Sequence, residues 1–133
     1  MSNKLKHILV IDDDDDIREV SQMSLETVGG YTITSLNNGK DAISQAPNIK
    51  ELDAILLDVM MPEMDGPTTL KKLREHSSLD AVPIILMTAR VQPLEVKKYL
   101  KMGAAGVISK PFDPMNLSNQ VLEIYKDFKQ KNS

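Results

Sequence analysis

Cysteine and tryptophan are both absent from this sequence of 133 residues, and only 4% of the residues are aromatic. The lack of cysteine excludes disulfide bonds, thiolate metal sites and a cysteine nucleophile. The scarcity of aromatic rings argues against a surface that stacks on nucleic-acid bases. Lysine and arginine form no basic block and the formal net charge is −3, so we expect no direct contact with nucleic acid.

Long hydrophobic runs are also missing, and no apolar stretch is long enough to span a membrane. Near the N-terminus, Lys4, Lys6 and His7 precede a short apolar stretch at residues 8–11, and a run of aspartates follows it. A secretory signal peptide needs a longer apolar core and a small-residue cleavage site. We therefore expect a cytoplasmic protein with no membrane partner.

Length and composition fit one globular domain. The chain is 41% hydrophobic and 26% charged, which is typical of a domain with one hydrophobic core. No linker, repeat or low-complexity segment interrupts it. We expect a single domain over residues 1–133, with its core at about 6–130 and with no effector domain.

Five stretches have the composition of β-strands, and they alternate with five stretches of helical periodicity. Strands are expected at residues 7–11, 31–36, 53–58, 82–88 and 107–109, and helices at about 15–30, 41–46, 67–77, 93–102 and 114–131. Strict alternation predicts a parallel sheet with helices on both faces. The expected class is α/β, a doubly wound flavodoxin-like sandwich of five βα units, for which 2-1-3-4-5 is a common strand order that the alternation by itself does not determine.

The first helix has a predicted inward face. Ile17, Val20 and Val28 share one side of it, with Leu25 at the margin. Its N-cap is expected at position 15 or 16, both aspartates, because acidic side chains favour the N-terminus of a helix.

The carboxyl ends of four strands meet in this topology, and they carry polar residues of complementary chemistry. These residues are Asp12, Asp13, Asp58, Thr88 and Lys110. Two carboxylates about 4 Å apart repel by roughly 4 kcal/mol at an effective dielectric constant of about 20, so three of them favour a bound cation. A hard divalent ion with oxygen ligands fits best, so we expect Mg²⁺, with Mn²⁺ as an alternative. Together with an ammonium and a hydroxyl group, such a cluster suits transfer of a phosphoryl group to an aspartate.

Four motifs in a fixed order carry a family resemblance. They are Ile-Asp-Asp at residues 11–13, Asp-Val-Met-Met-Pro-Glu-Met-Asp-Gly at 58–66, Met-Thr-Ala at 87–89 and Ser-Lys-Pro-Phe at 109–112. Each motif alone is weak, but the ordered set is specific and spans nearly the whole chain. The sequence resembles a response-regulator receiver domain of two-component signalling, of the stand-alone kind similar to chemotaxis regulators.

The resemblance implies a role for each residue of the cluster. Asp58 would accept a phosphoryl group from a phosphohistidine of a sensor histidine kinase or a histidine phosphotransfer protein. Asp13, Asp58 and the backbone carbonyl of Met60 would bind Mg²⁺ directly, and Asp12 would bind it through a water. Lys110 would pair with Asp58 and then with the phosphoryl oxygens. Such a protein is not a conventional enzyme, since it catalyses only its own phosphorylation and dephosphorylation.

The resemblance also implies a switch and an output surface. Thr88 would move to hydrogen-bond the phosphate, and the Lys110–Pro111 peptide bond would be cis. The switch and output residues would be Thr88, Ala89, Val107, Lys110 and Pro111. The family often has an aromatic residue at the position of Val107, so we expect a loop displacement here rather than a ring flip. A downstream protein would bind the face formed by the fourth helix, fifth strand and fifth helix, either on a monomer or on a phosphorylation-dependent dimer.

Two other functions agree with parts of the sequence. A haloacid-dehalogenase-type phosphohydrolase also uses a strand-end aspartate, Mg²⁺, a threonine and a lysine, and Asp12-x-Asp14 superficially fits its motif. That class usually needs a cap and more length, and it expects Thr or Val where this chain has Asp15 and Asp16. A non-phosphorylated interaction module is the third candidate, and the intact cluster argues against it.

Overall fold

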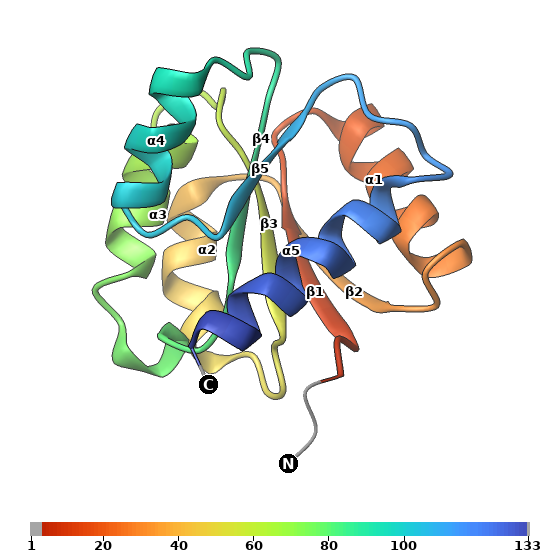
Figure 1. Cartoon of the computed structure of the whole chain (residues 1–133), viewed down its shortest axis with the longest axis horizontal. Helices are drawn as coiled ribbons and strands as arrows, with labels where there is room; N and C mark the ends of the chain where they lie inside the picture. The colour runs from red at the N-terminus through yellow and green to blue at the C-terminus, as the bar shows by residue number, and fades with distance from the viewer. Residues whose placement is uncertain (1–3, 133) are drawn as a thin grey trace.

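The computed structural model describes residues 4–132, and its five strands form one parallel sheet in the predicted order β2-β1-β3-β4-β5 (Figure 1). The strands are β1 (His7–Ile11), β2 (Thr32–Leu36), β3 (Ala54–Asp58), β4 (Ile84–Thr88) and β5 (Gly106–Ser109). The helices are α1 (Asp15–Thr27), α2 (Gly39–Gln45), α3 (Gly66–Leu73), α4 (Pro93–Lys101) and α5 (Leu117–Lys131), with 3₁₀ turns η1 (Ala46–Asn48) and η2 (Ser77–Leu79). Within the described residues, no helix has the length and apolar character needed to cross a membrane.

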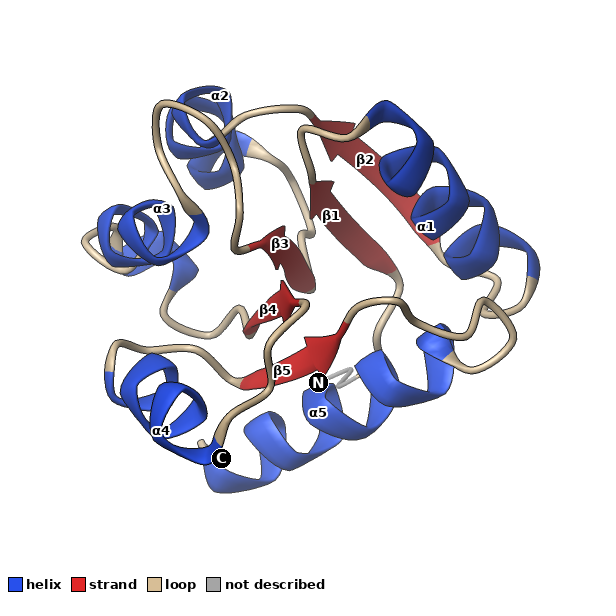
Figure 2. Cartoon of the chain, turned by 90° about the horizontal axis from the view of Figure 1, so that it is seen from above, coloured by secondary structure: helices blue, strands red, loops and turns tan. Residues whose placement is uncertain are grey.

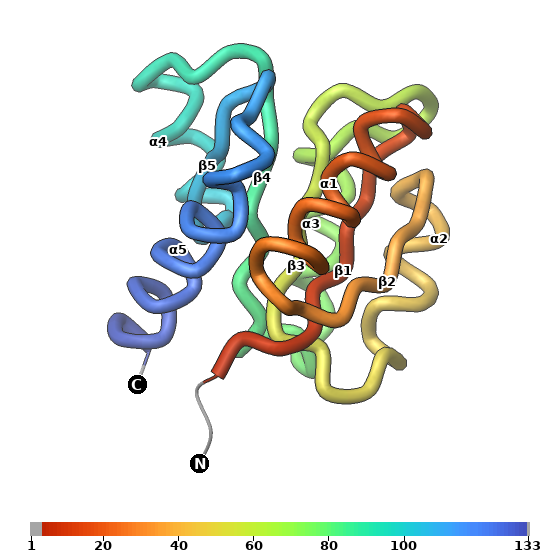
Figure 3. The backbone as a smooth tube through the Cα atoms, turned by 90° about the vertical axis from the view of Figure 1, so that its right-hand side faces the viewer, coloured from red at the N-terminus to blue at the C-terminus, as the bar shows by residue number. Residues whose placement is uncertain are grey.

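The helices cover both faces of the sheet, as Figure 2 shows, with α1 and α5 on one face and α2, α3 and α4 on the other. Figure 3 shows the sheet from the side, between α5 and α2. Side chains along β1 alternate between these layers: Ile8 and Val10 pack with α1 and α5, whereas Leu9 and Ile11 pack with α2, α3 and α4. Burying each such side chain stabilises the fold by about 1.5–3 kcal/mol, which fixes the strand register and therefore what lies at the strand ends.

Helix α1 buries a different face from the predicted one. Leu25 is fully buried, whereas Val20 and Val28 are 43% and 41% exposed. Ser24 is also buried and donates a hydrogen bond to the carbonyl of Pro114 in the segment before α5. The segment before α5 therefore contacts α1 through a small side chain with a hydroxyl donor. The prediction from hydrophobic periodicity alone chose the wrong face of the helix.

Helix α4 is anchored mainly at its C-terminal end. Tyr99 is its only buried residue, and the N-cap Gln92 makes no side-chain hydrogen bond. Leu94, in the first turn, is 81% exposed. At the other end, Gly103 has a positive φ of 109°, and Nε of Arg74 donates to its carbonyl at 2.9 Å. The N-terminal end of α4 is therefore the less constrained one.

Candidate functional site

The carboxyl edge of the sheet holds the polar residues that were expected there. Asp58 is the last residue of β3, Thr88 is the last of β4, and Lys110 follows β5 directly. The register pairs Thr88 with Ser109 and pairs Asp58 with the residue just before Thr88, so these positions lie almost level. Asp12 follows β1 at the same edge.

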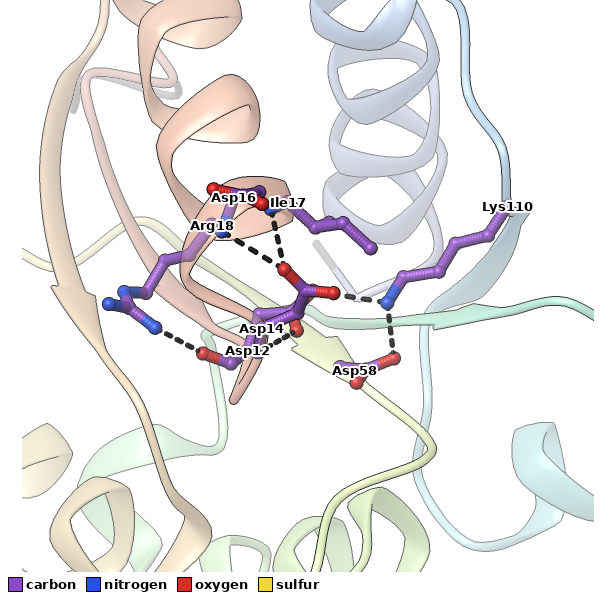
Figure 4. A network of polar contacts seen from close by, with 7 residues as sticks. All are labelled: Asp12, Asp14, Asp16, Ile17, Arg18, Asp58 and Lys110. Atoms are coloured by element: carbon purple, nitrogen blue, oxygen red, sulfur yellow. Dashed lines mark hydrogen bonds and ion pairs between the residues drawn. The ribbon is translucent and has the colours of Figure 1, made fainter.

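The ammonium group of Lys110 joins two buried carboxylates (Figure 4). Nζ donates to Oδ1 of Asp58 at 2.7 Å and to Oδ2 of Asp12 at 3.1 Å. Asp12 and Asp58 are only 2% and 4% exposed. One positive charge therefore faces two carboxylates that water barely reaches, which leaves the edge negatively charged.

Asp13 completes an acidic cluster with these two residues. One carboxylate oxygen from each of Asp12, Asp13 and Asp58 lies within 4.8 Å of the others, and Asp13 is the exposed member. The donor set consists of oxygens alone, which suits Mg²⁺, and its open side leaves room for the waters that Mg²⁺ retains. The residues present therefore fit a divalent cation of the expected kind.

Asp14 has a separate task at the start of α1. Its carboxylate caps the helix by accepting hydrogen bonds from the backbone N–H groups of Asp16 and Ile17 at 3.0 and 3.2 Å (Figure 4). The N-cap predicted at position 15 or 16 was therefore wrong, because the extended backbone that a cap requires occurs one residue earlier. The backbone N–H of Asp14 also donates to Oδ1 of Asp12 at 3.0 Å, so the turn orients the buried carboxylate.

Burial and neighbouring charges shift the pKa values of Asp58 and Lys110 for different reasons. The pKa of Asp58 is raised to about 6, first by burial and then by the charges of Asp12 and Asp13, against the lowering effect of the hydrogen bond from Lys110. Burial lowers the pKa of Lys110, but its hydrogen bonds to Asp58 and Asp12 outweigh burial and raise that pKa overall. The ammonium is therefore stable, whereas the negative charge of Asp58 is costly without a further cation.

Comparison with known proteins identifies the family of this chain. The family described as response regulator receiver domain matches residues 8–122, which is most of the sequence. The chain belongs to this family. The family is not one of conventional enzymes. The acidic triad is consistent with the metal site typical of receivers.

Relatives of this receiver are found among solved structures and curated proteins. Chemotaxis response regulator CheY4 of Vibrio cholerae is similar with a TM-score of 0.84 and 28% identity, covering 91% of this chain and 99% of that one. The Francisella response regulator 1452 receiver domain has a TM-score of 0.79 and 31% identity, covering 92% and 98%. Response regulator SaeR of Staphylococcus aureus is 36% identical over 113 residues, which are 85% of this chain and 47% of SaeR. The receiver spans about half the length of the curated relatives it matches.

Thr88 of this receiver is linked to the loop that leads into α4. Its Oγ1 accepts a hydrogen bond from the backbone N–H of Arg90 at 3.1 Å, and its carbonyl accepts one from the N–H of Lys110 at 2.8 Å. The Lys110–Pro111 peptide bond is cis, as the family resemblance implied. Val107 is half-buried in β5. A rotation of the Thr88 hydroxyl would therefore remove one contact that positions the 89–92 loop.

An apolar hollow opens beside Lys110, between α1 and the loop before α5. It has a volume of about 410 Å³ and is lined by Asp16, Ile17, Val20, Ala89, Lys110, Pro111, Phe112 and Pro114. Met23 in α1 and Met115 in the segment before α5 are also exposed. Sequence reasoning did not identify this hollow, because its wall comes from segments far apart in the chain.

The loop after Asp58 is held in place by close packing at Gly66. The N–H of Gly66 donates to the carbonyl of Val59 at 2.9 Å. A Cβ at position 66 would collide with the carbonyl oxygen of Asp58 and lie 2.7 Å from Cα of Val59, so a side chain would displace the loop. The loop carries Met60, which is 76% exposed beside the cluster.

Arg18 is a supporting residue that sequence reasoning missed. Its Nη1 donates to the carbonyl of Asp12 at 2.8 Å (Figure 4), and its Nη2 pairs with Asp15 at 2.5 Å. The spacing of three residues between Asp15 and Arg18 on a helix was a signal for the ion pair, although not for the contact with Asp12.

Proposed function

We propose that Asp58 of this receiver accepts a phosphoryl group from a phosphohistidine of a sensor histidine kinase or a histidine phosphotransfer protein. The observation that carries this proposal is the pairing of Asp58 with Lys110 at the end of a buried strand, beside two further carboxylates. An ammonium 2.7 Å from one oxygen holds the nucleophile in a defined orientation, which lowers the entropic cost of in-line attack.

In the proposed reaction, an oxygen of Asp58 attacks the phosphorus atom. The O–P bond forms while the N–P bond of phosphohistidine breaks, and the imidazole leaves with the electron pair. Asp13, Asp58 and the Met60 carbonyl would hold Mg²⁺ directly and Asp12 would hold it through a water, and the bound ion would supply positive charge for the phosphoryl oxygens. The ammonium group of Lys110, which pairs with the carboxylate of Asp58 before the reaction, then pairs with the oxygens of the transferred phosphoryl group. Water later attacks the phosphorus atom and breaks the same O–P bond, which releases inorganic phosphate and restores the carboxylate of Asp58.

The phosphodonor protein approaches over the apolar hollow. Lys110 lines the hollow and also bonds to Asp58, so a donor side chain seated there lies next to the reacting groups. Burial of that side chain contributes affinity and removes water from around the phosphoryl group.

The output leaves through the face of α4, β5 and α5. Thr88 gives up its contact with Arg90 when its hydroxyl bonds to the phosphate, and the 89–92 loop shifts with it. Ala89, Val107 and Pro111 follow this shift, and a downstream protein reads it, either on a monomer or on a phosphorylation-dependent dimer. The bond between Thr88 and Arg90 supports this route, because it couples one hydroxyl to the loop before α4.

Other expectations remain predictions. The cytoplasmic location that we predicted from the sequence remains a prediction. The haloacid-dehalogenase alternative is disfavoured, because Asp14, the second aspartate of its motif, is occupied as the cap of α1.

The proposal is tested by incubating the purified protein with Mg²⁺ and acetyl phosphate and measuring the intact mass. Wild type and Asp14→Ala should gain one phosphoryl group, and Asp58→Asn should gain none. A chelator should prevent labelling of wild type and of Asp14→Ala. Undiminished labelling of Asp58→Asn would assign the acceptor role to another carboxylate.

A further inference from the structure

Helices α3 and α4 and the segments between them carry positive charge in a chain that is negative overall. Residues 66–102 contain seven lysines and arginines against three aspartates and glutamates, a formal charge of +4, whereas the whole chain has −3. The two helices lie side by side on one face of the sheet (Figures 1 and 2). The excess of acidic residues therefore lies outside residues 66–102, and the net charge of this segment is opposite in sign to that of the rest of the chain.

The outward side of α4 combines one apolar side chain with three ammonium groups. Leu94 is 81% exposed, and Lys97, Lys98 and Lys101 are all exposed. They follow Leu94 at helical spacings that bring them onto the side away from the buried Tyr99. Leu94 therefore gains little from burial within the fold and adds one apolar contact point to the charged side of α4.

The ammonium groups of this face have no carboxylate partners of their own. Lys71 and Lys72 are exposed on α3, and none of the ion pairs among residues 4–132 involves them or the three lysines of α4. Glu95, the acidic residue of α4, accepts a hydrogen bond from the hydroxyl of Tyr99 at 3.3 Å. The positive charge of the surface is therefore not neutralised from within the described chain.

We propose that this α3–α4 lysine surface, consisting of Lys71, Lys72, Leu94, Lys97, Lys98 and Lys101, binds an acidic segment of a partner protein. An apolar side chain of the segment contacts Leu94, and flanking carboxylates face the lysines. The inference rests on the proposed function in one respect: it gives the chemistry of the output partner, since α4 follows the loop that Thr88 positions.

An acidic protein segment fits this surface better than nucleic acid or a membrane. Surfaces that bind single-stranded nucleic acid combine basic residues with exposed aromatic rings, whereas Tyr99 is buried and Arg74 donates to backbone carbonyls. A long polyanion would also extend over the acidic remainder of the chain, which would repel it. A membrane-binding helix presents a continuous apolar face, and the outward side of α4 offers Leu94 among lysines.

The test measures binding of a short synthetic peptide made of Glu, Asp, Leu and Ala, with a Gln and Asn counterpart as the neutral peptide. The triple variant Lys97→Gln, Lys98→Gln, Lys101→Gln should weaken binding by about tenfold or more, because the exposed charge pairs are lost together. The matched control Lys40→Gln, Lys50→Gln, Lys126→Gln changes the net charge equally at exposed positions elsewhere and should bind as wild type.

Two further measurements separate the components of binding. Leu94→Ala should weaken binding by about threefold, since truncating an exposed contact residue costs little outside a hot spot. Raising the salt concentration from about 50 mM to about 500 mM should weaken wild-type binding and change little in the α4 triple variant, because salt screens exposed charges.

Each variant is first checked by thermal unfolding and by acetyl phosphate labelling, which should match wild type. Equal affinity for the acidic and neutral peptides would overturn the proposal, and so would an equal loss in the control triple variant. Tighter binding of a single-stranded oligonucleotide or of anionic phospholipid vesicles through the same lysines would also overturn it. If Asp58 is not labelled in the wild-type protein, the proposed function is wrong. Peptide binding that still depends on the lysines of α4 would then support the proposed surface independently of that function.

Discussion

Lys110 places its Nζ 2.7 Å from Oδ1 of Asp58, although 52 positions separate the two residues in the sequence. The contact exists because β3 and β5 end at the same edge of the sheet, with β4 between them. Lys110 also bonds to Asp12, so two negative charges share one positive charge out of water. Whatever changes the charge at this edge, whether protons, a divalent cation or a phosphoryl group, should therefore change the stability and shape of the protein.

In metal-free buffer, the free energy of unfolding should fall as the pH rises from about 4 to about 7. The pKa of Asp58 is about 6 in the folded protein, above its ordinary value of 3.8. Between these values the folded state binds the proton more tightly than the unfolded chain does, so stability is lost as the proton leaves. The shift corresponds to on the order of 2–3 kcal/mol.

Urea unfolding of wild type and Asp58→Asn over this pH range measures the effect. The variant lacks the titrating carboxyl, so it should be more stable than wild type at pH 7 and should lose this part of the pH dependence. Mg²⁺ should restore much of the stability of wild type at pH 7 and do less for the variant. A stability difference that does not change with pH would contradict the assignment of the raised pKa to Asp58.

Asp13 should control the affinity for divalent cations, whereas Asp14 should not. Asp13 contributes an exposed oxygen to the acidic triad, and Asp14 is occupied as the helix cap. Isothermal titration with Mg²⁺ should give binding at least about tenfold weaker for Asp13→Ala than for wild type. Asp14→Ala should bind Mg²⁺ as wild type does but unfold about 1 kcal/mol more easily, because the cap is lost. Greater damage to Mg²⁺ binding in Asp14→Ala would exclude this ligand assignment.

Arg74 should contribute to stability through its guanidinium geometry rather than through its charge. Nε donates to the carbonyl of Gly103 at 2.9 Å and Nη1 to the carbonyl of Leu79 at 2.8 Å, so one side chain joins α3, η2 and the end of α4. Arg74→Lys keeps the charge but cannot reach both acceptors, and it should cost about 1–3 kcal/mol in urea unfolding. Lys72→Arg on the exposed side of the same helix should be neutral. Equal stability of Arg74→Lys and wild type would show that the two hydrogen bonds contribute little.

The strands and the acidic triad could be predicted from the sequence because each depends on local signals. Apolar runs such as Ile55–Leu57 are recognisable as buried strands, and parallel topology then brings their polar ends to one edge. The proximity of three carboxylates could therefore be predicted from the topology, without any measured distance. These are Asp12, Asp13 and Asp58. The motifs added the cis Lys110–Pro111 bond, which the structure contains.

The face of α1 and the apolar hollow could not be predicted in this way. Hydrophobic periodicity favoured Val20 over Ser24 for the interior, but the carbonyl of Pro114 selects a hydroxyl group at that contact. The wall of the hollow is built from α1, the loop after β4 and the segment before α5, whose relative positions are set by tertiary packing. The contact of Arg18 with the carbonyl of Asp12 likewise depends on the turn between them.

The apolar hollow should matter for transfer from a protein donor and not for transfer from a small one. Val20 lines the hollow, and Val28, about equally exposed at the C-cap of the same helix, is not among its lining residues. Val20→Asn should slow phosphorylation by a cognate phosphotransfer protein by about tenfold, which corresponds to loss of one partly buried apolar contact. Labelling by acetyl phosphate should be unchanged, and Val28→Asn should behave as wild type with both donors. Equal rates for the two variants with the protein donor would place donor docking elsewhere.

Thr88 should transmit the phosphoryl signal to α4 through its hydroxyl. In the free receiver, Oγ1 holds the N–H of Arg90 at 3.1 Å, and α4 is weakly anchored at its N-terminal end. A phosphate can bias this arrangement only through a contact that differs between two states, and the Thr88 hydroxyl supplies one. Amide chemical shifts with and without beryllofluoride, a phosphoryl mimic, should change from the Asp58 loop through residues 88–93 to 107–112.

Two variants at this position separate the hydroxyl from the side-chain volume. Thr88→Ser keeps the donor and should reproduce the wild-type pattern of shifts, whereas Thr88→Ala should restrict the changes to residues that surround the phosphate. Because Val107 provides no aromatic ring, the shifts near β5 must come from movement of the 89–92 loop, and they should disappear together with those of the loop in Thr88→Ala. Wild-type changes restricted to the phosphate surroundings, or an unaltered pattern in Thr88→Ala, would mean that the signal reaches α4 by another path or does not reach it.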